Sequence, residues 1–325
     1  MAAIISADIF DFSQYLKETD NKQHVKEAKS YTQQLKDKLR LKIKQKVNYL
    51  PWLKSKDLFE FREGELTMWA GVNGHGKSLL TSQAMLSLMG QGEKVCIASF
   101  EMRPVVTLQR MARNWIGVNP FTPEFQGNEG LEALDSLYEQ FSAWTDGKLW
   151  LYDQTGTAAF DTVLGMARYC AKELGINHIV IDNLAKCVAG EDDMNGQKKF
   201  IDELTAIARD YKCHIHVVHH IRKLETEFKK PGKNDLKGSG AIGDLADNVF
   251  IVFRNKEKEI DLRNGGKFSS MADDPDQSLI CVKQRNYEGI VSDEFELKLW
   301  FNIDSQLYTG EPHGAPLKFW EKWPH

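Results

Sequence analysis

Cysteine is scarce in this sequence and is not arranged for metal binding or cross-linking. Five cysteines lie far apart in 325 residues, and no two form a C-x-x-C pair: Cys96, Cys170, Cys187, Cys213 and Cys281. Zinc modules and disulfide frameworks need closely or regularly spaced cysteines, so this spacing argues against both. Free thiols persist in a reducing compartment, and we therefore expect a cytoplasmic protein.

Long hydrophobic runs and an excess of charge of one sign are also absent. No apolar run reaches the roughly 18 residues of a membrane-spanning helix, and no signal peptide is recognisable, so we expect no membrane partner. The formal net charge is −4. Any contact with nucleic acid must therefore come from a local basic patch. The hydrophobic content of 42% is ordinary for a globular protein.

One glycine-rich motif is present in full. The run GVNGHGKS, from Gly71 to Ser78, fits the phosphate-loop pattern G-x-x-x-x-G-K-[ST]. Residues 65–70 before it read as a buried strand, and residues 77–89 after it read as a helix with an apolar stripe. A chance match in a glycine-rich turn is the alternative. Because strand, loop and helix occur in order, the motif predicts binding of a nucleoside triphosphate.

The residues of this loop have distinct expected tasks. Gly71, Gly74 and Gly76 let the backbone wrap a phosphate chain with its N–H groups pointing inward. The following helix N-terminus adds partial positive charge. Lys77 is expected to reach the β- and γ-phosphates, and the Ser78 hydroxyl to bind Mg²⁺.

Strands and helices alternate after about residue 57, which predicts an α/β fold with a mainly parallel central sheet. A loop is expected over 120–130 and a disordered-looking insertion over 264–277. The last three strands are expected to form an antiparallel set at the sheet edge. The expected strands are 94–100, 148–153, 178–182, 213–220, 248–255, 278–286, 294–302 and 307–308, and the expected helices are 103–116, 159–174 and 197–211.

The first 50 residues differ from the rest. Residues 22–47 are Lys-rich, lack Gly and Pro, and carry a weak apolar stripe, which predicts one or two helices. Either this helix is solvated and packs loosely on its own domain, or it is an arm that docks on a neighbouring subunit. We expect residues 1–50 to form a helical arm and residues 51–325 to form the nucleotide-binding domain, with Pro51 and Trp52 at the junction.

Two carboxylates stand where parallel sheets place ligand groups. Asp182 ends the strand HIVID, which fits a Walker B carboxylate that holds Mg²⁺ beside Ser78. A helix cap is the alternative role. Glu101 ends the strand after the phosphate-loop helix, where a carboxylate can polarise the attacking water; otherwise it is an ordinary first-turn Glu. This order favours a RecA-like core over an adenylate-kinase-like one.

A family resemblance follows from these motifs and their order. The run GVNGHGKS, SFEM, VIDNL, HHIRK, DLKGSGAIGDLADNVF, KQRN and LWFN resembles the ring-shaped replicative helicases of the DnaB type, including bacteriophage primase-helicases and the mitochondrial helicase Twinkle. It covers about residues 58–310, and its most specific piece is residues 235–247. The resemblance implies a RecA-like core, ATP or another NTP with Mg²⁺, a hexameric homo-oligomer, and translocation on single-stranded DNA. A phage or mobile-element origin fits it.

The resemblance also assigns roles beyond the phosphate loop, Glu101 and Asp182. His220 matches a γ-phosphate sensor, although His219 lies next to it and a core histidine is the alternative. Arg285 matches an arginine finger that reaches a neighbouring subunit, with Lys283 as its partner; a surface arginine is the alternative. Arg254 and Phe301 resemble residues that stack on the base, with Tyr308 as a competitor and plain core as the alternative for Phe301.

A basic loop after the His220 strand is the expected DNA contact. Its cations suit sequence-independent gripping of phosphates, whereas a solvated loop is the alternative; they are Arg222, Lys223, Lys229, Lys230, Lys233 and Lys237. The loop over 185–197 carries acidic residues and is expected to bind phosphate poorly. The chain has neither a Cys-rich zinc module nor room for a primase domain, so priming is expected to come either from another polypeptide or from an N-terminal region absent from this sequence; a separate primase or loader is an expected partner. A RecA/KaiC-like DNA-binding or regulatory ATPase and an ATP-assembled interaction protein are the competing functions.

Overall fold

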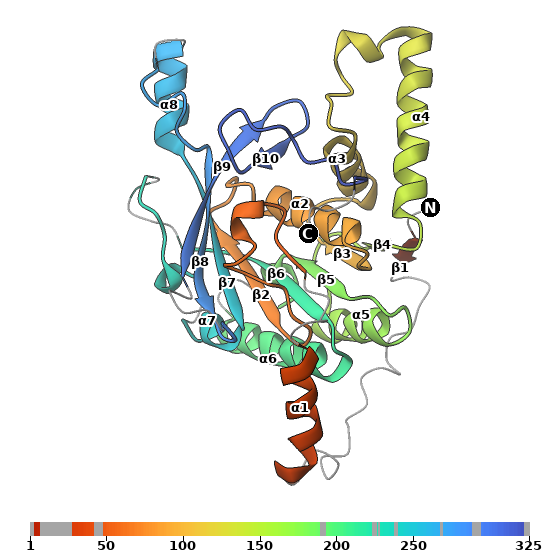
Figure 1. The fold of residues 1–325 in the computed structure, drawn as a ribbon, viewed down its shortest axis with the longest axis vertical. Coiled ribbons are helices and arrows are strands. Elements are labelled where there is room, and N and C mark those ends of the chain that lie inside the picture. The colour runs from red at the N-terminus through yellow and green to blue at the C-terminus, as the bar shows by residue number, and fades with distance from the viewer. Residues whose placement is uncertain are drawn as a thin grey trace.

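The computed structural model has one large sheet at its centre (Figure 1). Its strand order is β1-β4-β3-β5-β6-β2-β7-β8-β9-β10 among the described residues. The structure describes residues 3–6, 28–41, 48–188, 193–222, 226, 228–236, 240–266, 269–287 and 294–321. Strands β1 to β7 pair in parallel and β8 to β10 pair antiparallel, which confirms the mainly parallel sheet with an antiparallel edge.

Apart from β1, which was not expected, the strand bounds agree closely with those predicted from the sequence. The strands are β1 (Ala3–Ser6), β2 (Leu66–Gly71), β3 (Val95–Ser99), β4 (Leu149–Asp153), β5 (His178–Asp182), β6 (His214–His220), β7 (Asn248–Arg254), β8 (Gln277–Gln284), β9 (Phe295–Asn302) and β10 (Leu307–Thr309). Strands β2, β3 and β5 are buried at every position, as expected for strands covered on both faces by helices.

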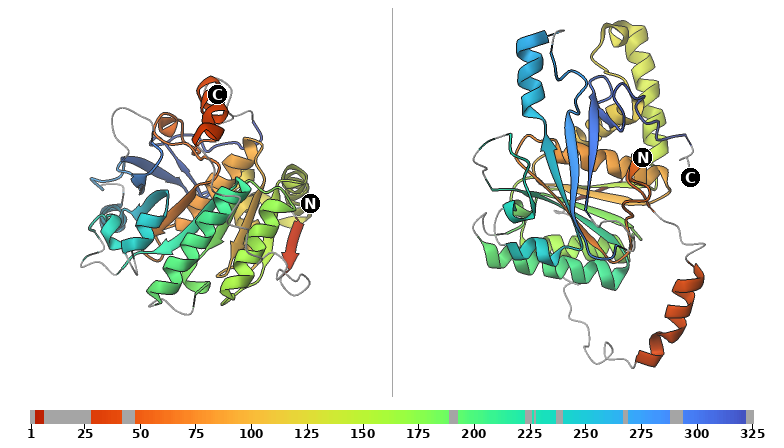
Figure 2. Two further views of the ribbon diagram at one scale, coloured as in Figure 1. Left: turned by 90° about the horizontal axis from the view of Figure 1, so that it is seen from below. Right: turned by 60° about the vertical axis from the view of Figure 1, so that its left-hand side comes forward.

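Helices cover both faces of the sheet (Figure 2). Met68 of β2 faces a core that it shares with α5, α6 and α7, whereas its neighbour Trp69 faces a core shared with α2, α3 and α4. The helices are α1 (Thr32–Leu41), α2 (Lys77–Gly90), α3 (Pro104–Ile116), α4 (Gly127–Thr145), α5 (Phe160–Lys172), α6 (Met194–Tyr211), α7 (Gly240–Leu245) and α8 (Lys256–Gly265). Within the described ranges, no helix combines the length and apolarity needed to cross a membrane.

Three helices were not predicted from the sequence: α4, α7 and α8. Residues 120–130 are not all loop, because the 19-residue helix α4 begins at Gly127. Gly130 lies against the backbone of Phe125, and a Cβ there would stand 2.6 Å from the Phe125 carbonyl carbon, so this glycine permits close packing rather than marking a loop. The insertion expected from 264 begins as the end of α8, whose Lys258 is buried and pairs with Asp276 at 2.8 Å.

The first 50 residues are not wholly helical. Ala3–Ser6 forms the strand β1, which extends the sheet by pairing in parallel with β4. Helix α1 stands away from the sheet in Figures 1 and 2, and its described part leaves Tyr31 just before it and Leu35 within it exposed. The part of the expected helix that lies outside residues 28–41 falls outside the described residues.

A candidate nucleotide-binding and hydrolysis site

The carboxyl ends of four neighbouring parallel strands meet at one edge of the sheet. Strands β3, β5, β6 and β2 are adjacent in that order. Glu101 follows β3, Asp182 ends β5, His220 ends β6 and the phosphate loop follows β2. Open α/β sheets bind ligands at this edge, and the topology alone therefore brings together groups that are far apart in the sequence.

The glycines of the phosphate loop adopt backbone conformations and close contacts that other residues would not permit. Gly74 and Gly76 have φ values of 77° and 79°, in the left-handed region that disfavours other residues. Gly71 lies so close to β7 that a Cβ would stand 2.6 Å from the Val252 carbonyl oxygen. The loop leads into α2 with Gly76 as N-cap, so free N–H groups of the first turn face the concavity.

Lys77 is buried beneath this loop. Its Nζ donates to the carbonyl oxygens of Gly71 at 3.0 Å and Val72 at 3.1 Å. Burial lowers the pKa of Lys77 to about 8, and the negative charges of Asp182 and Glu101 oppose that shift. A lysine held against the loop from below is placed to meet the charge of a bound phosphate.

Ser78 and Asp182 form an oxygen-lined position beside Lys77. The Ser78 hydroxyl donates to Asp182 Oδ2 at 2.6 Å, and burial raises the pKa of Asp182 to about 6. Such a carboxylate is stabilised in its charged form by a cation. Hydroxyl and carboxylate oxygens suit Mg²⁺, which is bound through one or two carboxylates together with substrate phosphates and water. The residues present therefore fit a nucleotide-bound Mg²⁺.

Glu101 and His220 are linked by a residue that the sequence reading did not single out. Asn183 Nδ2 donates to Glu101 Oε1 and to His220 Nε2, the latter at 3.0 Å. His220 Nε2 lies 3.9 Å from Glu101 Oε1. His219 is buried and His220 is half-buried at the cavity, so His220 is the histidine that faces this site. The position of Asn183, directly after the Asp182 carboxylate, was the available sequence signal.

A cavity of about 360 Å³ joins these groups. Arg110 of α3 also lines it and was not predicted; it is an exposed cation on the helix that follows Glu101. The lining residues are Asn73, Gly74, Gly76, Lys77, Ser78, Leu79, Glu101, Arg110, Asp182 and His220. Two cations, two carboxylates and the loop N–H groups thus converge on one polar hollow, which suits a triphosphate and a water molecule.

The residues expected to hold the base lie at the same edge of the sheet. Arg254, at the end of β7, donates through Nη1 to the Gly74 carbonyl at 3.1 Å and pairs with Glu259. Phe301 is 39% exposed. Tyr308 is buried, and its hydroxyl donates to Gln277 Oε1 at 3.0 Å, so Phe301 rather than Tyr308 is accessible to a base.

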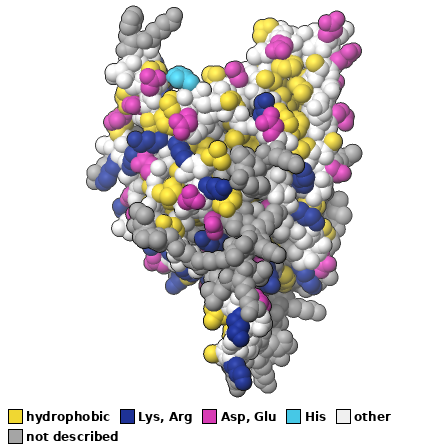
Figure 3. All heavy atoms as spheres, in the orientation of Figure 1, with side chains coloured by type: hydrophobic (Ala, Val, Ile, Leu, Met, Phe, Trp, Pro, Cys, Tyr) yellow, Lys and Arg dark blue, Asp and Glu magenta, His cyan; other side chains and the backbone are white. Residues whose placement is uncertain are grey.

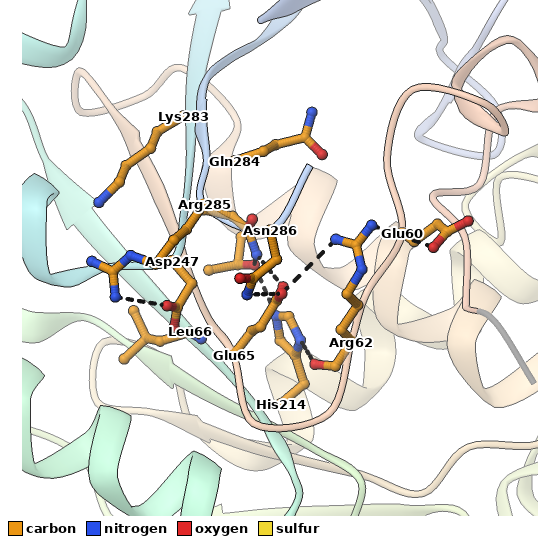
Figure 4. Close-up of polar contacts among 12 residues, drawn as sticks. Glu60, Arg62, Glu65, Leu66, His214, Asp247, Lys283, Gln284, Arg285 and Asn286 are labelled. Carbon is orange, nitrogen blue, oxygen red and sulfur yellow. Dashed lines mark hydrogen bonds and ion pairs between the residues drawn. The ribbon is translucent and has the colours of Figure 1, made fainter. Parts of the chain in front are cut away.

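Arg285 and Lys283 lie elsewhere. Arg285 contacts Asp247, whose other carboxylate oxygen accepts from the N–H of Leu66, at the start of β2 (Figure 4). The phosphate loop begins at the other end of β2. Because β2 is six residues long, the Asp247 contact at its start and the phosphate loop at its end lie about 17 Å apart along the strand. Arg285 therefore cannot reach the phosphate loop of the same chain.

The basic loop after β6 is partly neutralised by its neighbours. Arg222 pairs with Asp235 at 2.7 Å, Lys230 with Glu296 at 2.6 Å, and Lys233 with Asp244 at 2.6 Å. Lys229 is exposed. Lys223 and Lys237 lie outside the described residues.

These features define a class of protein: a RecA-like domain with a phosphate loop, a metal-binding carboxylate and a glutamate at the next strand end. Residues 56–300 match the model of the DnaB-like helicase C-terminal domain. The chain therefore belongs to the DnaB-like helicase family.

Similar proteins agree with this assignment. The DNA helicase/primase of Enterobacteria phage T3 is 26% identical over 215 residues, covering 61% of this chain and 37% of that protein. A solved ATPase domain superposes with a TM-score of 0.67 at 14% identity, covering 90% of this chain and 99% of that one. A DnaB-like replicative helicase, solved in a study of its interactions with primase, also gives a TM-score of 0.67 at 14% identity, over 88% of this chain and 67% of that one. The chain spans little more than a third of the length of the phage relative.

Proposed function

We propose that this domain is the ATP-driven motor of a hexameric replicative helicase that moves along single-stranded DNA and separates duplex DNA. The observation that best supports this proposal is that the hydrolysis site and Arg285 lie at opposite ends of the sheet within one subunit. The hydrolysis site lies at the carboxyl ends of the strands, whereas Arg285 lies at the opposite end of β2. A ring of subunits that face the same way brings the Arg285 end of one subunit to the site of the next.

Hydrolysis would use the residues at the cavity as follows. Lys77 and the loop N–H groups hold the β- and γ-phosphates, and Ser78 and Asp182 hold Mg²⁺, which offsets phosphate charge when bound. Glu101 orients the attacking water and accepts its proton, while Asn183 fixes the direction of the carboxylate. Arg285 of the adjacent subunit stabilises the charge of the transition state, and His220 contacts the γ-phosphate from the side of Glu101. Arg254 and Phe301 hold the base.

Ring assembly is supported by exposed apolar surface at two places. Figure 3 shows hydrophobic side chains gathered around α4 and the α3–α4 connection, where Phe121 is 70% exposed and Leu131 is 53% exposed. Helix α1 stands away from the sheet and exposes Leu35. The part of residues 1–50 that carries α1 thus acts as an arm that docks on a neighbouring subunit, whereas β1 belongs with residues 51–325 to the motor domain. A separate primase or loader, in the cytosol of a bacterial host, would complete the system.

Unwinding of a forked DNA duplex tests this function. The assembled wild-type protein should separate the fork with ATP, and Glu101→Gln should bind nucleotide normally but lose hydrolysis and unwinding by roughly 10²–10⁴-fold. Glu173→Gln, an exposed glutamate at the end of α5, is the matched control. Robust DNA-dependent hydrolysis with an intact fork would instead favour the RecA/KaiC-like ATPase without unwinding activity. Wild-type hydrolysis by Glu101→Gln would show that another group activates the water.

A further inference from the structure

Two buried carboxylates hold the segment that carries Arg285 (Figure 4). This segment, Lys283 to Asn286, spans the end of β8 and the turn after it. The Asp247 side chain is 3% exposed and the Glu65 side chain is 4% exposed. A buried carboxylate without partners is strongly unfavourable, so the groups that surround these two are an integral part of the local structure.

Arg285 is tied to Asp247 through both its main chain and its side chain. Its backbone N–H donates to the Asp247 carbonyl at 2.9 Å, and its Nη1 donates to Asp247 Oδ1 at 3.0 Å. Its Nη2 donates to the Asp244 carbonyl at 2.6 Å. A guanidinium has five N–H donors, so these contacts leave others for a phosphate. Its side chain is 39% exposed, so Arg285 is fixed in direction and still accessible.

Asp247 is itself held by groups other than Arg285. Its Oδ2 accepts from the Leu66 N–H at 3.0 Å, and its Oδ1 lies 3.4 Å from Arg209 of α6. The carboxylate therefore sits at a junction of β2, α6 and the turn after α7, three elements of the rigid core. An anchor of this kind fixes the side chain that it contacts much more firmly than a surface ion pair does.

The residues on either side of Arg285 are fixed as well. Asn286 Nδ2 donates to Glu65 Oε1 at 2.7 Å, and Gln284 Nε2 donates to the Leu58 carbonyl at 3.0 Å. Lys283 Nζ donates to the carbonyls of Gly243, Asp244 and Ala246, at the C-terminal end of α7, at 3.0, 2.8 and 2.6 Å. These three bonds use all three donors of the ammonium group. In this arrangement Lys283 fixes α7 against β8.

We propose that Asp247 is the positioning residue of the arginine that acts across the subunit interface, with Glu65 and Asn286 as a secondary anchor. This inference rests on the proposed function. A free arginine side chain loses about 2 kcal/mol of rotamer entropy when it is immobilised. The Asp247 carboxylate immobilises Arg285 before the neighbouring subunit arrives, so the interface does not have to supply that free energy. Preorganised charge of this kind acts mainly on the transition state.

A double-mutant cycle on ATP hydrolysis by the assembled protein with single-stranded DNA tests the proposal. Asp247→Asn keeps an oxygen for the Leu66 N–H but removes the charge that holds Arg285. It should lower kcat by roughly tenfold or more, with little change in the KM for ATP. In an Arg285→Ala background the same substitution should have almost no further effect. Asp210→Asn, an exposed carboxylate near the same end of α6, is the charge-matched control.

Mixed rings distinguish positioning across the interface from a structural effect within the subunit. Asp247→Asn subunits mixed with Lys77→Ala subunits should regain activity, because an intact Arg285 then meets an intact phosphate loop at some interfaces. If Arg285→Ala is rescued in this way and Asp247→Asn is not, Asp247 acts through β2 on its own site and the inference is overturned. If Arg285→Ala itself shows no rescue, the proposed trans arrangement fails instead.

Loss of folding in Asp247→Asn would be detected by thermal melting, and Asn286→Ala then serves as the second variant. This substitution, in the turn after β8, removes the hydrogen bond from Asn286 Nδ2 to Glu65 Oε1. The proposal expects a lowered kcat that Lys77→Ala subunits rescue. A folded Asn286→Ala protein with wild-type kcat would contradict anchoring of this segment as a requirement for activity.

Discussion

At the scale of single residues, the hydrolysis site depends on an amide between two expected catalytic groups. Asn183 donates both hydrogens of its Nδ2, one to Glu101 and one to His220, and it is itself almost fully buried. Because Nδ2 is a donor, His220 Nε2 accepts, and the ring carries its proton on Nδ1. In the proposed function, where His220 contacts the γ-phosphate, a change at that phosphate would reach Glu101 through the single side chain of Asn183.

Replacement of Asn183 by Ala should lower kcat for ATP hydrolysis by roughly 10–100-fold, because hydrogen bonds to charged groups contribute about 1.5–3 kcal/mol. Nucleotide affinity should change little, since Lys77 and the loop remain. Steady-state hydrolysis and binding of a fluorescent ATP analogue measure the two effects. Asn264→Ala, an exposed asparagine in α8, is the control. An unchanged kcat would mean that the Glu101 carboxylate is oriented without the amide.

At the scale of elements, the loop between β6 and α7 is not simply a basic surface loop, because several of its cations are already ion-paired. Three of its described cations have carboxylate partners, and two of those partners, Glu296 and Asp244, belong to β9 and α7. These pairs are largely exposed, and exposed pairs contribute only about 0–1 kcal/mol. DNA phosphates can replace the carboxylates, but each replacement exposes an unpaired acid beside the DNA.

Lys229 should therefore contribute more to DNA binding than Lys230 or Lys233. Lys229→Ala should reduce the slope of log affinity against log salt by about 0.7 for single-stranded DNA, whereas Lys230→Ala and Lys233→Ala should change it less. Fluorescence anisotropy titrations at several salt concentrations measure this slope, with Lys172→Ala on α5 as the control. The ranking is wrong if the two paired lysines flatten the slope and Lys229 does not.

At the scale of the whole molecule, two buried histidines on β6, His214 and His216, make stability depend on pH. His214 Nδ1 contacts the Arg62 carbonyl at 2.7 Å and its Nε2 contacts the Thr67 hydroxyl at 2.8 Å. His216 Nδ1 accepts from Trp69 Nε1 at 3.2 Å, so its own proton lies on Nε2, toward His178 Nδ1 at 3.1 Å. Both environments suit neutral rings. Burial lowers the pKa of His214 to about 4 and that of His216 well below its usual value.

These shifts give the sign of the pH dependence. Below about pH 6.5 the unfolded chain binds protons that the folded His214 and His216 do not, so the free energy of unfolding falls as the pH falls. The loss should be roughly 1.5 kcal/mol per histidine between pH 6.5 and 5. The carboxylates of Asp182 and Glu65, whose pKa values are raised by burial, act in the opposite direction.

A comparison of His214→Gln with the wild-type protein separates the contribution of His214 to the pH dependence of stability from those of the carboxylates. In urea unfolding at pH 7 and pH 5, His214→Gln should be less stable than wild type at pH 7 but should lose less stability on acidification. The contributions of Asp182 and Glu65 cancel in this comparison. His313→Gln, whose side chain is 87% exposed, should keep the wild-type pH dependence. Equal pH dependence of His214→Gln and wild type would show that His214 is not held neutral in the fold.

Local patterns in the sequence determined the parallel sheet and the phosphate loop. The strands β2, β3 and β5 are short apolar runs buried on both faces, and GVNGHGKS stands between a strand and a helix. Helix α4 was missed because Gly127 and Gly130 resemble loop glycines, whereas Gly130 serves a close contact with Phe125. The strand β1 was missed because its four residues are too few to show the alternation of apolar and polar residues that predicts a strand. Only their pairing with β4 identifies them as one.

The amino-acid sequence by itself determined which chemistry the chain carries: a phosphate loop, two carboxylates after strands, and an arginine near the last strands. Only the tertiary structure decided which groups meet. It placed Asn183 between Glu101 and His220, brought Arg110 into the cavity, and separated Arg285 from the phosphate loop by the length of β2. The physical reason is that strand neighbours are set by packing across the whole sheet. Contacts such as Lys230 with Glu296 and Arg285 with Asp247 join segments that no local pattern relates.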